Sequence, residues 1–276
     1  MTGLSEARVV ELEEACRRVR RTVVRALHQA GSGHPGGSFS QAEFLTVLYL
    51  EKLRHQPSHP DWPERDMVFL SKGHAAPGWY AVMAEAGYFD AEEIVRTLRN
   101  PDSVFQGHPS NEHTPGVDIS SGSLGQGLSV ANGVALAARL DGLDRRSYCI
   151  IGDGELQEGQ VWEAAMTAAH FHLDHVCAIV DWNKIQLDAR TEDIKTLGGL
   201  AAKWQSFGWH VIEIDGHDLR QVSDAFDEAA GTKGKPTVIL AHTVKGKGVS
   251  YMENDAKWHG LAPNQEELEI ALRELM

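Results

Sequence analysis

Short apolar runs alternate with amphipathic stretches along most of this chain. The runs at 66–71, 147–152, 175–181, 209–214 and 236–243 have the length and continuity of buried strands. Helical periodicity occupies 5–30, 41–52, 78–86, 127–140, 158–171, 196–207, 218–230 and 265–276. This alternation predicts an α/β fold in which a parallel sheet is covered by helices on both faces.

Three stretches of turn-forming residues interrupt the pattern. Residues 31–38 (GSGHPGGS) carry too much Gly and Pro to continue a helix. Residues 100–120 are rich in Pro, Gly, Ser and His, and we expect a long irregular segment there. Residues 215–218 (DGHD) are expected to form a turn and a helix cap. Because no repeat or linker divides the chain, we predict one domain over 1–276.

Composition excludes several classes of function. The chain has 276 residues and a net charge of −13, which argues against nucleic acid as a partner because phosphate neutralisation needs a basic surface. No apolar stretch reaches membrane-spanning length, and residues 1–21 lack the apolar core of a signal peptide. The three cysteines are an odd number and form no Cys-x-x-Cys pair, so we expect a cytoplasmic protein without disulfides or a structural zinc site.

Polar side chains follow directly after two of the predicted strands or lie at their ends. Gly152-Asp153-Gly154 ends one apolar run, and residues 181–185 (DWNKI) end the next. Open α/β sheets bind ligands at the carboxyl ends of their strands. Asp153 and Asn183 would supply a partial cage of oxygens there, which Mg²⁺ completes with phosphate oxygens and water. A turn with an N-capping Asp is the alternative for Asp153 alone, but the matching Asn183 favours a magnesium diphosphate site.

Two loops and two acids have competing interpretations. Residues 122–127 (GSLGQG) could bind a phosphate through backbone N–H groups or simply begin a helix. Residues 245–248 (KGKG) could contact a phosphate or form a solvated loop. Glu155 and Glu158 are expected only to favour a helix N-terminus.

Four histidines share one local context. Each lies in a Gly-bearing loop: His34, His74, His108 and His259. A single loop histidine would more often be an inert surface group. Four with the same flanking chemistry favour a polar pocket whose imidazoles bind hydroxyls or phosphates.

Taken in this order, the motifs resemble the N-terminal, diphosphate-binding part of transketolase, a thiamine-diphosphate enzyme. The resemblance runs from residues 32–36 (SGHPG) to 258–260 (WHG), and 69–75 (FLSKGHA), 106–109 (QGHP) and 125–127 (GQG) make it specific for transketolase-like members. It implies the thiamine-diphosphate-binding (PP-type) fold. It also implies transfer of a two-carbon ketol (glycolaldehyde) unit from a ketose or its phosphate to an aldose or its phosphate. The implied cofactors are thiamine diphosphate and Mg²⁺, for which other divalent cations could substitute.

The resemblance also assigns roles to individual residues. Asp153 and Asn183 would bind the metal through their side chains, and Ile185 through its backbone carbonyl. The implied cofactor contacts are His74, Ser123, Leu124, Gly125, Gly154, Asn183, Lys245 and His259. The implied catalytic residues are His34, His108 and His259. We hypothesise that His259 or His108 takes or relays the proton of the donor's C3 hydroxyl, while His34 and His74 orient substrate and cofactor.

A full transketolase continues into a pyrimidine-binding domain and a C-terminal domain, and the family's activating glutamate lies in the part missing from this sequence. The resemblance therefore implies a split enzyme of the pentose phosphate pathway, with a C-terminal subunit on a separate chain and an α2β2 heterotetramer. Because 265–276 completes a helix, we expect a natural terminus. The alternatives are half of a 1-deoxyxylulose-phosphate synthase or dihydroxyacetone synthase, and a non-catalytic cofactor-binding subunit. The presence of Asp153, Asn183 and the histidines favours a catalytic role.

Overall fold

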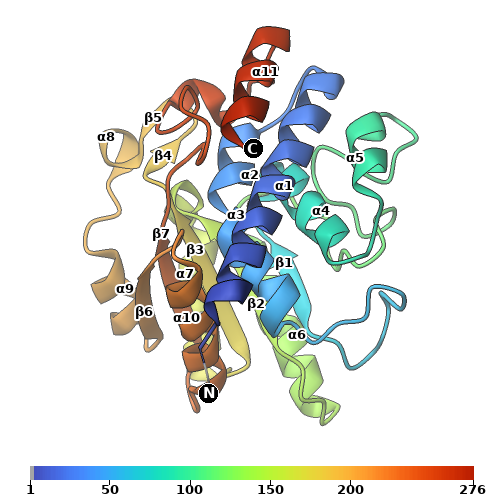
Figure 1. Ribbon diagram of the computed structural model, residues 1–276. Helices are drawn as coiled ribbons and strands as arrows, with labels where there is room; N and C mark the ends of the chain where they lie inside the picture. Colours follow the sequence, from blue (N-terminus) through green and yellow to red (C-terminus); the bar gives the residue numbers. More distant parts are fainter. Residues whose placement is uncertain (1–2) are drawn as a thin grey trace.

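The structure, a computed structural model, describes residues 3–276; residues 1–2 of the predicted domain lie outside the described part. Its central sheet has five strands in the spatial order β1-β2-β3-β7-β6 (Figure 1). Their bounds are β1 (Met67–Leu70), β2 (Ser147–Gly152), β3 (Val176–Trp182), β7 (Thr237–His242) and β6 (His210–Asp215). All neighbouring pairs are parallel, so the predicted α/β fold with a parallel sheet is confirmed.

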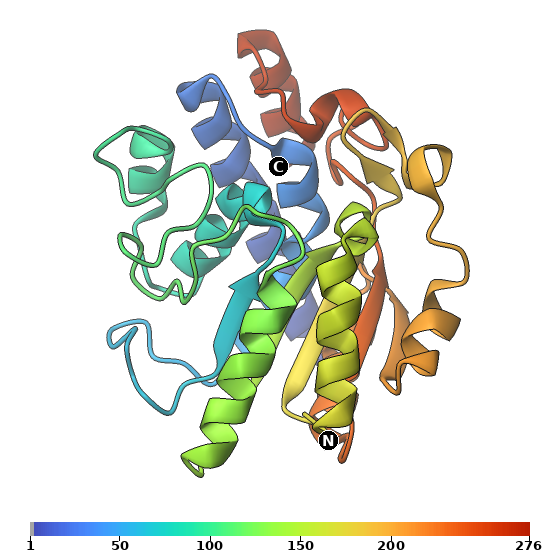
Figure 2. The ribbon, with the colours of Figure 1, turned by 180° about the vertical axis from the view of Figure 1, so that it is seen from behind.

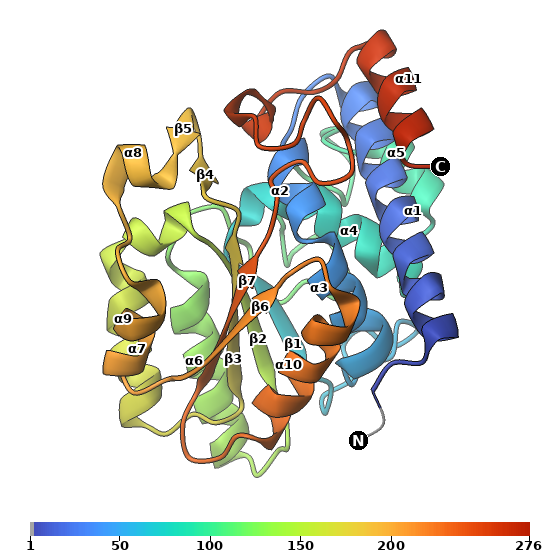
Figure 3. The same cartoon turned by 60° about the vertical axis from the view of Figure 1, so that its left-hand side comes forward.

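Alternate residues of the central strands face two separate apolar layers. In β2, Tyr148 and Ile150 pack in one layer, whereas Cys149 and Ile151 pack in the other. A strand buried on both faces needs apolar side chains at nearly every position, which explains why the sequence shows continuous runs rather than alternation. Figure 3 shows the two layers of helices on either side of the sheet.

Helices cover both faces of the sheet. The larger layer contains α1 (Glu6–Ala30), α2 (Pro35–Ser40), α3 (Ala42–Val47), α4 (Ala76–Glu85), α5 (Ala91–Thr97), α10 (Leu219–Gly231) and α11 (Gln265–Glu274). The opposite layer contains α6 (Gly127–Leu140), α7 (Gly159–His170) and α9 (Leu200–Ser206), of which α6 and α7 lie across the sheet in Figure 2. Beyond β3 the chain forms a small hairpin, β4 (Ile185–Gln186) and β5 (Ala189–Arg190), followed by α8 (Thr191–Lys195).

The first glycine-rich break was only partly predicted. Helix α1 ends as expected, because Gly31 adopts a left-handed φ of 63° and its N–H bonds to the carbonyl of His28. Residues 35–40, however, form α2 instead of a loop, with Pro35 at the first helical position, where its missing N–H does no harm. A side chain at Gly36 would meet the carbonyl oxygen of Trp258 at 2.8 Å, so this helix uses glycine for close packing.

Other departures from the sequence pattern concern short elements. The predicted helix 41–52 is α3 continued by a π-helical turn, Leu48–Lys52, and the predicted helix 196–207 begins only at Leu200. Helices α5 and α8 and the β4–β5 hairpin were not predicted, because elements of two to seven residues carry too little periodicity. The irregular segment expected over 100–120 is confirmed.

Two expectations from composition can be examined in the described residues. No helix within residues 3–276 is both long and apolar enough to cross a membrane. Cys16, Cys149 and Cys177 are free thiols buried in the protein.

Candidate functional site

A pocket of about 380 Å³ lies where β2 and β3 end. Most of the predicted site residues line it: His34, His74, Leu124, Asp153, Gly154, Asn183, Ile185, Lys245 and His259. Three predicted residues are outside this lining: Ser123, Gly125 and His108. The fold thus brings together segments from both ends of the chain at the edge of the sheet where a ligand was expected.

The predicted metal ligands are neighbours because β2 and β3 pair directly. Gly152 is in register with Asp181, so Asp153 and Asn183 follow adjacent strand ends. One carboxylate oxygen of Asp153 accepts from the N–H of Gly154 at 2.7 Å, and the other from the N–H of Lys184 at 2.5 Å. Asn183 Oδ1 accepts from the N–H of Ile185 at 3.1 Å. These bonds hold the Asp153 carboxylate, which follows β2, against residues 183–185, which follow β3.

The donor set fits a hard divalent cation. It comprises one carboxylate, one amide and one backbone carbonyl, and Mg²⁺ prefers oxygen ligands of this kind. Burial and the nearby Asp181 carboxylate raise the pKa of Asp153 from 3.8 to about 6. A cation beside it would remove this penalty. Within residues 3–276, no three His, Cys, Asp or Glu side chains form a metal-binding group, so a metal here would depend on the amide, the carbonyl and phosphate oxygens.

A lysine already contacts the carbonyl of this predicted set. Lys245 Nζ donates to the carbonyl oxygen of Ile185 at 3.0 Å and to His259 Nδ1 at 2.8 Å. Lys245 is buried, so the solvated-loop interpretation of residues 245–248 is wrong for it. Burial lowers the pKa of Lys245 to about 8, which still leaves most of the ammonium charged at neutral pH. A metal on Ile185 would have to share this carbonyl with the lysine or displace it.

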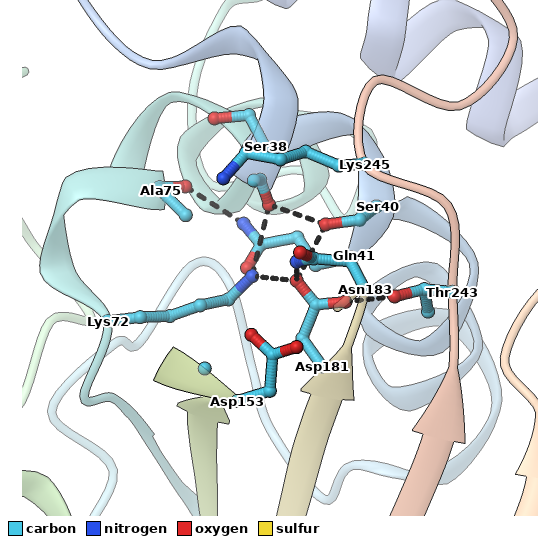
Figure 4. Close-up of polar contacts among 12 residues, drawn as sticks. Ser38, Ser40, Gln41, Lys72, Ala75, Asp153, Asp181, Asn183, Thr243 and Lys245 are labelled. Atoms are coloured by element: carbon cyan, nitrogen blue, oxygen red, sulfur yellow. Dashed lines mark hydrogen bonds and ion pairs between the residues drawn. The ribbon is translucent and has the colours of Figure 1, made fainter. Parts of the chain in front are cut away.

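An ion pair that the sequence did not predict lies beneath the pocket. Lys72 and Asp181 are both buried, and Lys72 Nζ lies 2.6 Å from Asp181 Oδ2 and 3.0 Å from the carbonyl oxygen of Gly37. Ser40 and Thr243 also donate to the Asp181 carboxylate (Figure 4). Burial alone would raise the pKa of Asp181, but Lys72 and these hydrogen bonds hold it below its ordinary value. Asp181 is therefore a fixed negative charge joining four segments of the chain.

Asp181 also orients the predicted metal ligand Asn183. A carboxylate can only accept hydrogen bonds, so the Asn183 group that lies 3.1 Å from Asp181 Oδ2 must be its NH₂. The amide oxygen is then directed away from Asp181 and is available to a cation. Lys72 and Asp181 stand in two stretches that the sequence singled out, yet neither received a role. The missed signal was a charged residue beside a buried strand, which requires a partner.

Four loops bring the predicted histidines close together. The ring of His34 lies 5.3 Å from that of His74 and 5.4 Å from that of His259, centroid to centroid, and His74 and His259 are 5.1 Å apart. His108 lies farther out, 6.3 Å from His34 and packed against Gly122. The predicted clustering of imidazoles is therefore present, with three on the pocket and His108 beside it.

These imidazoles are neutral at physiological pH. Burial lowers the pKa of His34 to about 4 and that of His259 to about 3, with further lowering by Lys245 in both. Burial lowers the pKa of His74 well below 6.5. The pKa of His108 is also lowered, mainly by burial and to a smaller extent by the charge of Arg99. The pKa values of His34, His74 and His259 therefore lie below the ordinary value for imidazole. They can donate or accept hydrogen bonds to a polar ligand without carrying charge.

The glycine-rich loop before α6 is less free than a phosphate loop requires. The N–H of Gly125 donates to Glu155 at 2.7 Å, and the N–H of Gly127 donates to Ser71 Oγ at 3.1 Å. Glu155 also accepts from Ser71 and from the N–H of Gly152. The expectation that Glu155 only favours a helix end is wrong, because it is a buried acceptor that joins this loop to β1 and β2. Leu124 lines the pocket, whereas Gly125 does not.

Comparisons with known proteins agree with this geometry. The family model described as "Transketolase, thiamine diphosphate binding domain" matches residues 12–275. The chain is 45% identical over 267 residues to one of the subunits of the apulose-4-phosphate transketolase of Actinobacillus succinogenes, covering 96% of each chain. It is 42% identical over 266 residues to the 6-deoxy-6-sulfo-D-fructose transketolase subunit SqwG of Clostridium sp. (strain MSTE9), again covering 96% of each.

Solved structures give the same fold. Transketolase from Leishmania mexicana superposes with a TM-score of 0.90 at 32% identity, covering 96% of this chain and 41% of that chain. The chain therefore spans nearly the whole length of the two subunits above but about two-fifths of this longer protein.

Proposed function

This chain belongs to the transketolase family as its thiamine diphosphate binding domain, and from that premise we propose that it is the diphosphate-binding subunit of a transketolase whose remaining domains lie on a second polypeptide. The reaction would move a two-carbon ketol unit from a ketose donor to an aldose acceptor. The observation that carries the proposal is one pocket in which Asp153, Asn183 and the carbonyl of Ile185 face a cluster of neutral histidines.

The cofactor site is proposed from the chemistry of its donors. Thiamine diphosphate, when bound, supplies the nucleophilic carbon that the reaction needs. We propose that Asp153, Asn183 and the Ile185 carbonyl hold Mg²⁺, or another divalent cation, against the diphosphate. Gly154, His74, Leu124 and Lys245, which line the same pocket, would contact the cofactor.

The hydrogen bond between Lys245 and His259 distinguishes the two proton-transfer candidates. The ammonium of Lys245 donates to His259 Nδ1, so the neutral ring carries its proton on Nε2 and acts there as a donor. His108 makes no side-chain hydrogen bond to any residue in 3–276, so no neighbour fixes its tautomer and the unprotonated nitrogen of its neutral ring is free to accept a proton. We therefore favour His108 for taking or relaying the C3 hydroxyl proton, with His34 and His259 holding the sugar hydroxyls.

The names of the relatives support an anionic sugar as substrate. One relative is named for a sulfonated ketose and the other for a ketose phosphate. We propose a donor of this class. Turnover of phosphorylated pentoses would support the expected place in the pentose phosphate pathway, whereas exclusive turnover of sulfofructose or apulose phosphate would place the protein in another sugar pathway.

A reconstitution experiment tests this function. The chain is purified alone and mixed with the product of a neighbouring reading frame, and ketol transfer is measured with 6-deoxy-6-sulfofructose, apulose 4-phosphate and fructose 6-phosphate as donors. We expect Mg²⁺ and thiamine diphosphate to bind the chain, transfer only in the mixture, and none with Asp153→Ala. Copurification and mass measurement test the proposed α2β2 assembly. Activity of the chain alone would contradict the split active site, and binding without transfer in any mixture would favour a non-catalytic subunit.

A further inference from the structure

His217 lies in the turn between β6 and α10, outside the pocket, and bonds to two other segments of the chain. Its Nδ1 lies 2.9 Å from Glu43 Oε2 on α3. Its Nε2 lies 2.8 Å from the backbone nitrogen of Val244, the second residue after β7. The turn itself was predicted, and Asp218 caps α10 as expected, but the role of the histidine within it was not.

These two contacts fix the tautomer of the ring. A backbone N–H can only donate, so Nε2 must be the unprotonated acceptor. The ring proton then lies on Nδ1 and is donated to the Glu43 carboxylate. His217 therefore donates from Nδ1 to Glu43 on α3 and accepts at Nε2 from the N–H of Val244. Exchanging the two ring protonation sites would break both hydrogen bonds.

The carboxylate that accepts from His217 is firmly anchored. Glu43 is buried and pairs with Arg20 of α1 at 2.7 Å, and Arg20 also donates to the carbonyl oxygen of Phe39 at 2.9 Å. Burial alone would raise the pKa of Glu43, but Arg20 and His217 outweigh it and hold the pKa below its ordinary value. Glu43 therefore remains an ionised carboxylate, which accepts the hydrogen bond from His217 Nδ1.

The other contact of His217 holds the segment that delivers Lys245. Val244 stands between Thr243, which donates to Asp181, and Lys245, whose ammonium reaches Ile185 and His259. The N–H of Gly246 bonds to the carbonyl of Gly36 at 3.1 Å. His217 supplies the only side-chain acceptor for the Val244 N–H within residues 3–276, so its loss frees the residue before the lysine.

We propose that His217 is a positioning residue: through Val244 it holds Lys245 at the diphosphate end of the pocket. This inference rests on the proposed function, since Lys245 matters only if the pocket binds the diphosphate. His217 does not line the pocket, and it acts by restricting the backbone from which the lysine extends.

Two conservative variants separate the contacts. In His217→Gln the amide oxygen can reach the former Nε2 position and accept from Val244, whereas in His217→Asn the shorter amide can reach only Glu43. Dissociation constants for Mg²⁺–thiamine diphosphate are measured by calorimetry on the full chain, with melting temperatures beside them. His210→Gln is the matched control, because its Nε2 pairs with Glu228 at 2.7 Å on the exposed side of the same strand and helix.

We expect His217→Asn to weaken cofactor binding about tenfold or more, as for outer residues that orient a ligand, while His217→Gln and the control stay near the wild type. Equal affinities of the wild type and His217→Asn for the cofactor would overturn the inference. So would equal losses of affinity in His217→Asn and His217→Gln that parallel the fall in their melting temperatures. Failure of the wild type to bind would instead contradict the proposed function.

A spectroscopic measurement needs no cofactor. Imidazole ¹⁵N shifts of the wild-type chain should show His217 as a neutral ring protonated on Nδ1. The Nε2-protonated tautomer, or a doubly protonated ring, would be incompatible with the bond to Val244 and would overturn the inference even if affinities changed.

Discussion

Replacing Asp153 by Asn should change cofactor binding and the stability of the cofactor-free chain in opposite directions at neutral pH. Asp153 is buried, and its pKa in the folded chain is about 6 rather than 3.8. A raised folded-state pKa means that the folded chain binds this proton more tightly than the unfolded chain does. The stabilisation from that proton is complete below about pH 3.8 and is lost as the pH rises through about 6. Asparagine has no proton to lose, so the variant escapes this penalty.

The magnitude follows from the two pKa values. At 1.36 kcal/mol per pKa unit, the difference between 3.8 and about 6 corresponds to about 3 kcal/mol. Asparagine keeps only one of the two oxygens that accept from Gly154 and Lys184, and an unpaired buried N–H costs about 1–3 kcal/mol. That cost does not depend on pH. The pH-dependent part of the difference therefore isolates the carboxylate.

Urea unfolding of the cofactor-free chain between pH 4 and 7.5 measures this difference. We expect the stability of Asp153→Asn relative to wild type to rise by about 2 kcal/mol over this range, because at pH 4 the aspartate of the unfolded chain is already partly ionised. Groups that titrate in both proteins, such as the pocket histidines, cancel in the comparison. Asp102→Asn, on the exposed surface, is the control and should show no such rise.

Addition of the ligand at pH 7.5 should stabilise the wild type and not Asp153→Asn. Mg²⁺–thiamine diphosphate at one hundred times its dissociation constant stabilises a protein by about 2.7 kcal/mol, and we expect this gain in wild type but not in Asp153→Asn. A relative stability that stays constant with pH would refute the claim that Asp153 is a strained, buried charge. Equal stabilisation of both proteins by the ligand would refute its role at the metal.

Three further experiments test contacts elsewhere in the fold. Lys72→Met should destabilise the chain by about 3–5 kcal/mol because it leaves the buried Asp181 charge unpaired, and adding Asp181→Asn should restore most of this loss in urea unfolding; no restoration would contradict the pairing. In α6, Gly127→Ala should lower the melting temperature because its Cβ would lie 2.5 Å from the Ser71 Cβ, whereas Gly133→Ala, with no atom within 4 Å, should stabilise by about 0.5–1 kcal/mol; the same sign for both would refute the contact. Asn264→Ala, which removes the capping box of α11, should cost about 1 kcal/mol in urea unfolding, and an unchanged midpoint would show that the cap is not used.

The sequence was most informative where chemistry is local. The apolar runs of β2 and β3 end in Asp153 and Asn183, and the rule that ligands bind at strand ends was enough to predict a shared site. Their adjacency depends on strand order, which resemblance implied and periodicity could not reveal. Local patterns also gave the ends of α1 and the irregular segment at 100–120.

The buried network could not be predicted because its members are distant in sequence. Lys72 pairs with an aspartate 109 positions away, and Ser40 reaches the same carboxylate from 141 positions away. Glu155 was misjudged for a related reason. An acid after a strand resembles an ordinary helix start, and only the tertiary fold shows that it accepts from Ser71 and Gly125. The low histidine pKa values likewise arise from burial that local sequence does not encode.

A crystal grown with thiamine diphosphate and Mn²⁺, an anomalous scatterer that takes the oxygen ligands of Mg²⁺, tests the central claim most directly. We predict one anomalous peak in contact with the side chains of Asp153 and Asn183, the carbonyl of Ile185 and the diphosphate. A diphosphate bound elsewhere, or a metal peak that touches neither strand end, would contradict the account.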